Sequence, residues 1–145
     1  MKFKLEIVTP ERLIYSEEVD SVTIPTLQGE ITVLAHHMPV VSIISPGEIK
    51  IKKESEIVYM AITGGFVQIT SQKVTILADA AERAEEIDIE RAEKARERAR
   101  KLLAEKQLDK TSHAEALAAL QRALIRIKIG RRKGPRIEKE TTPHI

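Results

Sequence analysis

The sequence predicts an α+β protein in which an N-terminal all-β sandwich or flattened barrel precedes a C-terminal antiparallel two-helix hairpin. Residues 1–84 contain short segments of alternating polar and apolar side chains, separated by Pro or Gly. Residues 85–130 are rich in Ala, Glu, Lys and Arg, and their apolar residues recur every three or four positions. Residues 131–145 are polar and basic, contain Gly and Pro, and are expected to form a flexible tail.

Seven segments of the first region carry the period-two pattern of a half-buried strand. In KFKLEIV, the side chains of Phe3, Leu5 and Ile7 fall on one face and the charged side chains fall on the other. The other six segments are VDSVTIP, GEITVLAHHMP, GEIKIKK, IVYMAIT, GFVQIT and KVTILA. The core positions that they predict are Val19, Val22, Ile24, Ile31, Val33, Ile49 and Ile51. Short strands rich in Val, Ile and Thr at this spacing are typical of a sandwich or barrel.

The helical region predicts two helices that pack on each other. The first runs from Asp88 to about Gln107 and places mostly alanine on its apolar face: Ile89, Ala92, Ala95, Ala99, Leu102 and Leu103. The second is expected to begin at the capping box of Ser112 and Glu115 and to end at Gly130. Its apolar positions are Ala114, Leu117, Leu120, Leu124 and Ile127. We expect the leucine stripe to pack against the alanine stripe.

Composition excludes several classes of protein. The 145 residues include no cysteine, so there is neither a disulfide framework nor thiolate chemistry. No apolar run is long enough to span a membrane, and the N-terminus lacks the apolar core of a signal peptide, so we expect a soluble protein on the cytoplasmic side. Aromatic residues make up only 3% of the chain, which argues against a stacking platform for nucleic acid.

Charge is divided unevenly between the two regions. Residues 1–79 carry seven Lys or Arg and ten Asp or Glu, whereas residues 80–145 carry seventeen and twelve. The C-terminal region is therefore expected to meet an acidic partner. No catalytic residues are predicted, because no nucleophile–base motif and no Gly-rich phosphate loop occur. His36 and His37 lack Cys or acidic neighbours, so we assign them to a loop and predict no metal site.

Four stretches in order, GEITVLAHHMPVV, ITGGFVQI, KVTILADAAERAEEIDIERA and LQRALIRI, resemble the epsilon subunits of bacterial F-type, proton-translocating ATP synthases. The resemblance covers residues 2–129. It implies a non-catalytic rotor subunit of the central stalk that couples proton translocation to rotary ATP synthesis. The implied partners are the gamma subunit and the polar loops of the c-ring. The implied location is peripheral, on the cytoplasmic side of the plasma membrane, with no direct membrane insertion.

The same resemblance implies two arrangements of the hairpin. In the folded arrangement the helices pack down, and in the extended one they meet the alpha and beta subunits and inhibit ATP hydrolysis. We hypothesise that a basic face of the extended hairpin meets acidic loops on the beta subunits, and its residues are Arg122, Arg126, Lys128, Arg131 and Arg132. The resemblance also places Glu30 and His37 at the rotor contact, toward the c-ring or gamma; for Glu30 the alternative is an ordinary turn carboxylate.

ATP-binding members of the family carry I/L-D-x-x-R-A at the start of the first helix, and Ile87, Asp88, Arg91 and Ala92 match this motif. The resemblance adds further residues to a regulatory ATP site: Glu82, Arg98, Arg122 and Arg126. Residues four or seven apart share a helix face, so two arginine pairs can meet a triphosphate. No obligatory cofactor is implied. The alternative is that Asp88 only caps the helix and that the arginines form a solvated face.

Three other classes of protein stay open at the level of sequence. A basic nucleic-acid-binding protein would use the second helix and the RRKGPR segment to contact phosphates, and salt-sensitive DNA binding would distinguish it. An enzyme is disfavoured by the missing motifs. A generic scaffold with a helical hairpin would not co-purify with a gamma subunit. Of the four interpretations, we favour the rotor subunit.

Overall fold

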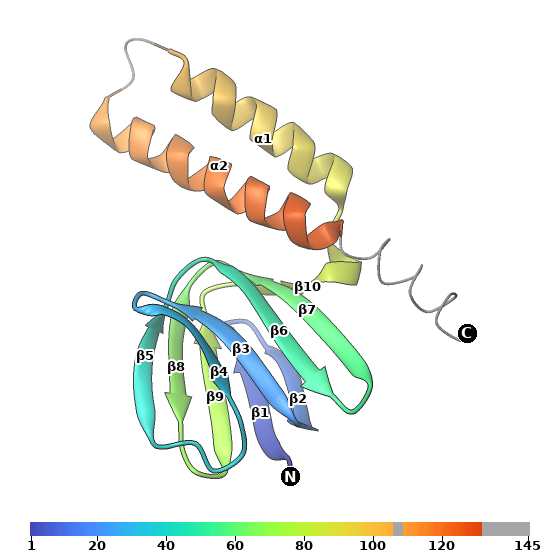
Figure 1. Cartoon of the computed structure of the whole chain (residues 1–145). Coiled ribbons are helices and arrows are strands. Elements are labelled where there is room, and N and C mark those ends of the chain that lie inside the picture. Colours follow the sequence, from blue (N-terminus) through green and yellow to red (C-terminus); the bar gives the residue numbers. More distant parts are fainter. Residues whose placement is uncertain (106–108, 132–145) are drawn as a thin grey trace, which may run out of the picture. The chain divides into compact units, whose positions relative to one another are not determined.

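The computed structural model describes residues 1–105 and 109–131 (Figure 1). The chain divides into two compact units, Met1–Arg83 and Ala84–Ile145. The first unit is built of strands and the second of helices, which confirms the predicted α+β class. The tail predicted for residues 131–145 lies outside the described residues beyond Arg131.

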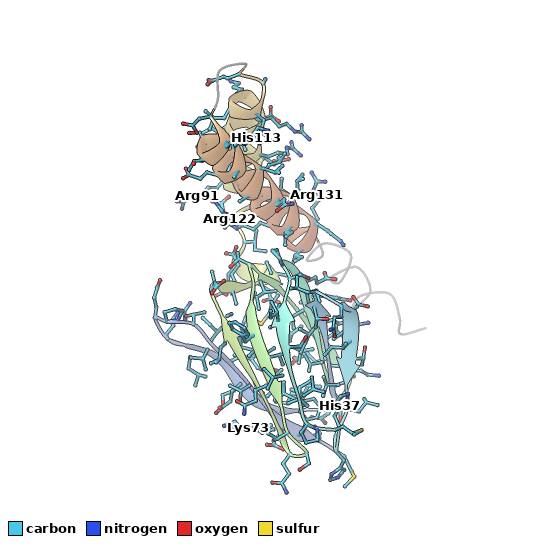
Figure 2. All side chains as sticks on the ribbon, turned by 90° about the vertical axis from the view of Figure 1, so that its left-hand side faces the viewer. His37, Lys73, Arg91, His113, Arg122 and Arg131 are labelled. Carbon is cyan, nitrogen blue, oxygen red and sulfur yellow. The ribbon has the colours of Figure 1, made fainter. Side chains whose placement is uncertain are left out.

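Ten strands form the first unit. They are β1 (Phe3–Val8), β2 (Leu13–Val19), β3 (Ser21–Thr26), β4 (Gly29–Val33), β5 (Val40–Ile44), β6 (Gly47–Lys53), β7 (Glu56–Ile62), β8 (Gly65–Ile69), β9 (Lys73–Ala78) and β10 (Ala81–Arg83). They follow the order β10-β7-β6-β3-β5-β8-β9-β1-β2, with β4 paired to β3. Only the β1–β9 pair is parallel. The sheet curls into a nearly closed barrel, and Figure 2 shows His37 and Lys73, from the loop after β4 and the start of β9, at the same end.

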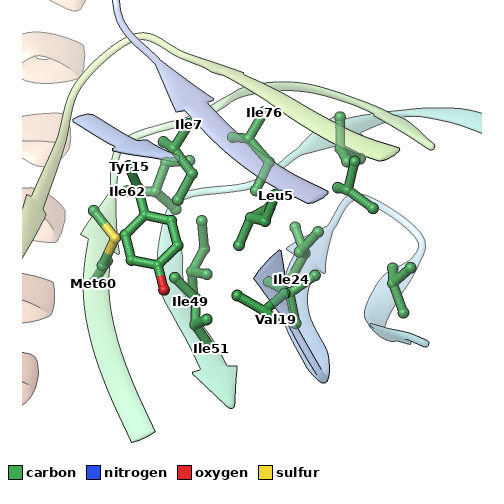
Figure 3. Packing of buried hydrophobic residues seen from close by; sticks show 14 of the residues in the cluster. Leu5, Ile7, Tyr15, Val19, Ile24, Ile49, Ile51, Met60, Ile62 and Ile76 are labelled. Carbon is green, nitrogen blue, oxygen red and sulfur yellow. The ribbon is translucent and has the colours of Figure 1, made fainter. Parts of the chain in front are cut away.

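The barrel is filled by the side chains on the inner face of each strand. Leu5 and Ile7 on β1, and Ile49 and Ile51 on β6, are fully buried, as the period-two pattern predicts (Figure 3). The other predicted core positions are also buried, except that Ile31 is only partly covered. Alternation works here because a strand turns successive side chains to opposite faces, so one face collects the apolar residues.

Three strands were missed by the sequence analysis: β2, β5 and β10. Val19 ends β2 instead of beginning the following strand, and Pro25 lies inside β3, with its carbonyl accepting a hydrogen bond from the Ser45 N–H at 3.0 Å. The β5 segment VVSII shows no polar–apolar alternation because its outward-facing residues are apolar as well. In β2, the charged Glu17 shares the inward face with Tyr15 and Val19, which conceals the pattern.

Side chains close the seam between the edge strand β2 and the strands on the other side of the barrel. The Lys53 ammonium donates to the Glu17 carboxylate, and the Arg83 guanidinium lies 5.3 Å from the centre of the Tyr15 ring. At the end of the seam, the Asp20 N–H donates to the Lys52 carbonyl at 2.9 Å. An inward-pointing charge on an edge strand also discourages pairing with another chain.

The Glu17–Lys53 pair predicts a pH dependence of stability. The hydrogen bond from Lys53 lowers the pKa of Glu17 below its ordinary value of 4.5, and the same bond raises the pKa of Lys53. A lowered carboxylate pKa stabilises the fold above the unfolded-state value, and this stabilisation is lost as the pH falls through the folded-state pKa. We expect Glu17→Gln to lower the urea midpoint modestly at pH 7, with the difference from the unsubstituted protein vanishing in acid.

Glu18→Gln is the matched control for this prediction. Glu18 is the next residue on β2, points to the opposite face of the strand and is exposed. Its substitution should leave the urea midpoint almost unchanged both at pH 7 and in acid. Equal effects of the two substitutions would show that the Glu17–Lys53 pair does not stabilise the seam.

The second unit contains a short 3-10 helix, Ala84–Glu86, followed by α1 (Ile89–Leu103) and α2 (Lys110–Gly130). Asp88 caps α1, and the first helix ends at Leu103, earlier than the predicted Gln107. The capping box at Ser112 was a wrong prediction: Asp109 caps α2 and accepts from the Ser112 N–H at 2.7 Å. That bond lowers the pKa of Asp109. An Asp one turn ahead of Ser112 supplies the cap, so the helix begins earlier.

The predicted packing of a leucine stripe on an alanine stripe was wrong for Leu117 and Leu124, whereas Ala92, Ala99 and Ile127 are buried as predicted. The buried residues of α1 are Ala92 and Ala99, and those of α2 are Ala116, Ala123, Ile127, Ile129 and Gly130. Leu117 and Leu124 are 43% and 42% exposed. Alanines seven residues apart on both helices let the two backbones approach closely, and this rotates the leucines about 100° away from the contact.

Candidate functional site

Four arginines of the predicted ATP site come from both helices of the hairpin. Arg91 and Arg98 lie on α1 beside its buried alanines, and Arg122 and Arg126 lie on α2. At about 100° per residue, each pair lies roughly a quarter-turn or slightly more from the buried stripe of its own helix. Because the helices run antiparallel, these directions coincide on one face of the hairpin. Figure 2 shows Arg91 and Arg122 on the same side.

The accessibility of this arginine face suits a charged ligand. The side chains of Arg91, Arg98 and Arg122 are exposed, and Arg126 is partly buried. Guanidinium groups present planar, paired donors that fit phosphate oxygens. The arrangement can therefore bind a polyanion.

The two acidic residues of the predicted site occupy different units. Asp88 caps α1, with its Oδ1 accepting from the Arg91 N–H at 3.1 Å, so the capping role considered for it is present in the structure. A carboxylate that caps through one oxygen retains further acceptor capacity. Glu82 is in β10 of the sandwich, opposite Ala61 of β7, whereas the four arginines belong to the hairpin.

Of the residues predicted as one basic face, the four that the structure describes do not share a face of α2. Arg131 donates to Glu93 of α1 at 3.5 Å, and Figure 2 shows it on the side of the hairpin opposite Arg122. Lys128 is two residues after Arg126, so it points well away from that side chain. Arg132 lies outside the described residues. The basic character of this helix is therefore distributed around it.

The two predicted rotor-contact residues lie at opposite ends of β4. Glu30 is the second residue of the strand, beside the tight turn from β3, and it is exposed. His37 follows the end of the strand, with its Nδ1 2.8 Å from the Met38 carbonyl oxygen. No cluster of three metal-binding side chains occurs among residues 1–105 and 109–131.

An apolar row on the outer face of the sandwich, exposed except at the partly buried Val8, was not predicted. It crosses five neighbouring strands, and its members are Ile43, Phe66, Leu77, Val8 and Leu13, each opposite the next in register. Phe66 and Leu77 are 53% and 51% exposed. Contiguous exposed apolar surface is typical of an interaction site. The sequence contains a signal for this row. GFVQIT and KVTILA each contain two adjacent apolar residues, and because successive side chains of a strand face opposite sides, one residue of each pair must face outward.

Comparison with known families decides the identity. Residues 2–84 match the family model described as "ATP synthase, Delta/Epsilon chain, beta-sandwich domain", and residues 85–130 match "ATP synthase, Delta/Epsilon chain, long alpha-helix domain". The chain belongs to the ATP synthase delta/epsilon chain family. Epsilon subunits are non-catalytic members of the rotary ATP synthase complex, and this chain is one of them.

Relatives cover nearly the whole length of this epsilon-type chain. The ATP synthase epsilon chain of Dehalococcoides mccartyi is 44% identical over 138 residues, which is 94% of this chain and 99% of the relative. The epsilon chain of Syntrophobacter fumaroxidans is 48% identical over 128 residues, 88% and 95% of the two chains. None of the described helices is both long and apolar enough to span a membrane.

Solved structures agree with this assignment. A chain of the Euglena gracilis mitochondrial ATP synthase, in a structure of its OSCP, F1 and c-ring, matches with a TM-score of 0.74 and 30% identity over 83% of this chain and 76% of that one. A chain of the Tetrahymena thermophila central stalk and c-ring matches with a TM-score of 0.59 at 17% identity over 90% and 97%, which supports the fold.

Proposed function

We propose that this protein is the central-stalk rotor subunit that links the gamma subunit to the c-ring and couples proton translocation to rotary ATP synthesis. The observation that carries the proposal is the match of both regions, in order, to the two domains of the delta/epsilon family. Two similar solved chains come from ATP synthase structures that include the c-ring, one of them together with the central stalk. In this role the protein is peripheral, on the cytoplasmic side of the membrane, and binds no nucleic acid.

The apolar row is the surface proposed to bind gamma. A row of five outward-facing apolar side chains on one sheet is costly to expose to water, and covering it supplies binding free energy in proportion to its area. The opposite side of the barrel has a polar outer face at β3 and β4, where the hydroxyls of Thr23 and Thr32 are hydrogen-bonded at 3.0 Å. Because Glu30 and His37 lie at opposite ends of β4, we expect them to contact different partners, one the polar loops of the c-ring and the other the gamma subunit.

Association with gamma tests this role directly. The full chain, co-expressed with the gamma subunit of its own ATP synthase, is expected to purify as an equimolar complex. A chain that purifies alone, while folded by circular dichroism, would contradict the rotor role. Salt-sensitive binding of duplex DNA by the same preparation would favour the nucleic-acid alternative.

The arginine face of the hairpin supports a second, regulatory proposal. ATP binds Arg91, Arg98, Arg122 and Arg126 and thereby favours the folded hairpin. It does so only to the extent that it binds this state better than the extended one. At an ATP concentration a hundredfold above Kd, the gain is about 2.7 kcal/mol. When ATP is scarce the hairpin extends, its basic side chains meet the alpha and beta subunits, and hydrolysis stops.

A calorimetric ATP titration of the purified full chain tests the regulatory proposal. Arg91→Ala and Arg126→Ala should each weaken ATP binding about 10- to 100-fold, since a charge-assisted phosphate contact contributes roughly 1.5–3 kcal/mol. Asp88→Ser should also weaken binding, because it removes the carboxylate while serine still caps the helix. The matched control is Arg100→Ala, since Arg100 lies on the other side of α1 and faces Glu97 at 3.5 Å.

Two outcomes would contradict the ATP site. Absence of saturable binding at millimolar ATP would leave Asp88 as a helix cap alone. Equal weakening by Arg100→Ala and Arg91→Ala would show that net charge, and not the shared arginine face, governs binding.

A further inference from the structure

The last turn of α2 approaches the start of α1 unusually closely. Gly130 is the final residue of α2 and is buried. A Cβ placed on it would lie 3.0 Å from Ile87 Cγ2, 3.0 Å from Ile89 Cγ1 and 3.3 Å from Ile87 Cβ. These distances are shorter than ordinary carbon–carbon contacts of about 3.5–4.0 Å, so this approach depends on the missing side chain. α2 ends at Gly130, as predicted, but Arg131 keeps a right-handed φ of −69°. The glycine is therefore explained by the close approach and not by a left-handed turn at the helix end.

The two isoleucines that Gly130 touches are the immediate neighbours of Asp88. We infer that Gly130, Ile87 and Ile89 form a clasp that holds the end of α2 on the start of α1, positions Asp88, and must open before the hairpin can separate. The positioning of Asp88 for a nucleotide rests on the proposed ATP site. The clasp itself rests only on the packing.

Apolar burial within the hairpin is concentrated at this end. The buried isoleucines of the unit are Ile87, Ile127 and Ile129. Apart from Gly130, the other buried positions of α1 and α2 are alanines, which bury much less apolar area each. A substitution that disturbs the packing of the clasp should therefore destabilise the hairpin more than one elsewhere in α1 or α2.

The nearby ion pair is not the source of the clasp. Arg131 and Glu93 approach to 3.5 Å, but their side chains are 61% and 42% exposed. Exposed pairs of this kind contribute little because water and salt screen them. Arg131→Gln thus provides a variant at the same place in the fold that removes the ion pair and leaves the packing intact.

Amide hydrogen exchange of the full chain with Gly130→Leu tests the clasp. Leucine is a better helix former than glycine, so α2 is not intrinsically weakened. Its side chain cannot fit against Ile87 and Ile89, so exchange in residues 89–93 and 124–130 should accelerate at least about tenfold. Exchange in the sandwich strands serves as an internal reference and should stay unchanged.

The matched control is Gln121→Leu, which adds a leucine at an exposed position of α2. It and Arg131→Gln should keep exchange within about twofold of the unsubstituted protein. The clasp is overturned if Gly130→Leu exchanges no faster than Gln121→Leu, or if Arg131→Gln accelerates exchange as much as Gly130→Leu.

ATP titration of the same variant separates the clasp from the ATP site. If the unsubstituted chain binds ATP, Gly130→Leu should weaken binding about tenfold or more, and unchanged affinity would overturn the positioning of Asp88. If the unsubstituted chain binds no ATP, the ATP proposal and the positioning of Asp88 both fail, while the exchange result still decides whether the clasp exists.

Discussion

Gly65→Ala is expected to lower the free energy of unfolding of the sandwich by about 3–5 kcal/mol, since overpacking and backbone strain each cost about 1–3 kcal/mol. Gly65 begins β8 with φ +140°, a conformation that L side chains rarely adopt. An added Cβ would lie 2.1 Å from the Leu77 carbonyl oxygen and 2.9 Å from Ala78 Cα. Both contacts are with the backbone of β9, which is held in the sheet, so no side-chain rotation relieves them.

Gly29→Ala is the matched control, because it separates strain from overpacking. Gly29 also has a positive φ, +119°, but no atom lies within 4 Å of its added Cβ. Its substitution should cost only the strain, about 1–3 kcal/mol. Urea unfolding followed by circular dichroism, which suits a chain without tryptophan, measures both variants. If Gly65→Ala is no less stable than Gly29→Ala, the close approach of β8 and β9 at this position is not rigid.

The sequence predicts those features that depend on neighbours along the chain. Leu5, Ile7, Ile49 and Ile51 are buried because alternation within a single strand fixes their face, whichever strands lie beside them. The start of α1 is predicted for the same reason, since Asp88 caps its own helix. The i,i+7 and i,i+4 spacings likewise predict that the two arginines of each helix lie on one face of that helix. They do not predict that the two pairs lie on the same face of the hairpin, because this depends on the antiparallel packing of α1 on α2.

Features set by partners distant in sequence are not predictable in this way. Glu17 faces inward because Lys53, thirty-six residues away, neutralises it, so β2 shows no clean alternation. Leu117 and Leu124 are among the largest apolar side chains of α2, yet alanine packing turns them outward, because close backbone approach is available only to small side chains. The apolar row arises from the register of five strands and is visible only once that register is known.

Phe66→Glu is expected to weaken association with the gamma subunit roughly 30- to 1000-fold. Phe66 is the central member of the apolar row, with Ile43 on one side and Leu77 on the other. Truncating a central aromatic residue of an interface costs about 2–4 kcal/mol, and a buried unpaired carboxylate adds to that cost. The fold should keep its stability, because 53% of Phe66 is already in contact with water.

Thr32→Glu is the matched control, since it adds the same charge to the outer face of β4 on the other side of the sandwich. Titration of gamma against each full-length variant, together with thermal unfolding of each, distinguishes an interface effect from loss of fold. Weak binding by Phe66→Glu alone, with unchanged unfolding, places gamma on the apolar row, because only there does the new charge become buried. Equal weakening by both variants would assign the effect to net charge, and full binding by Phe66→Glu would move gamma to another face and leave the row to a different partner.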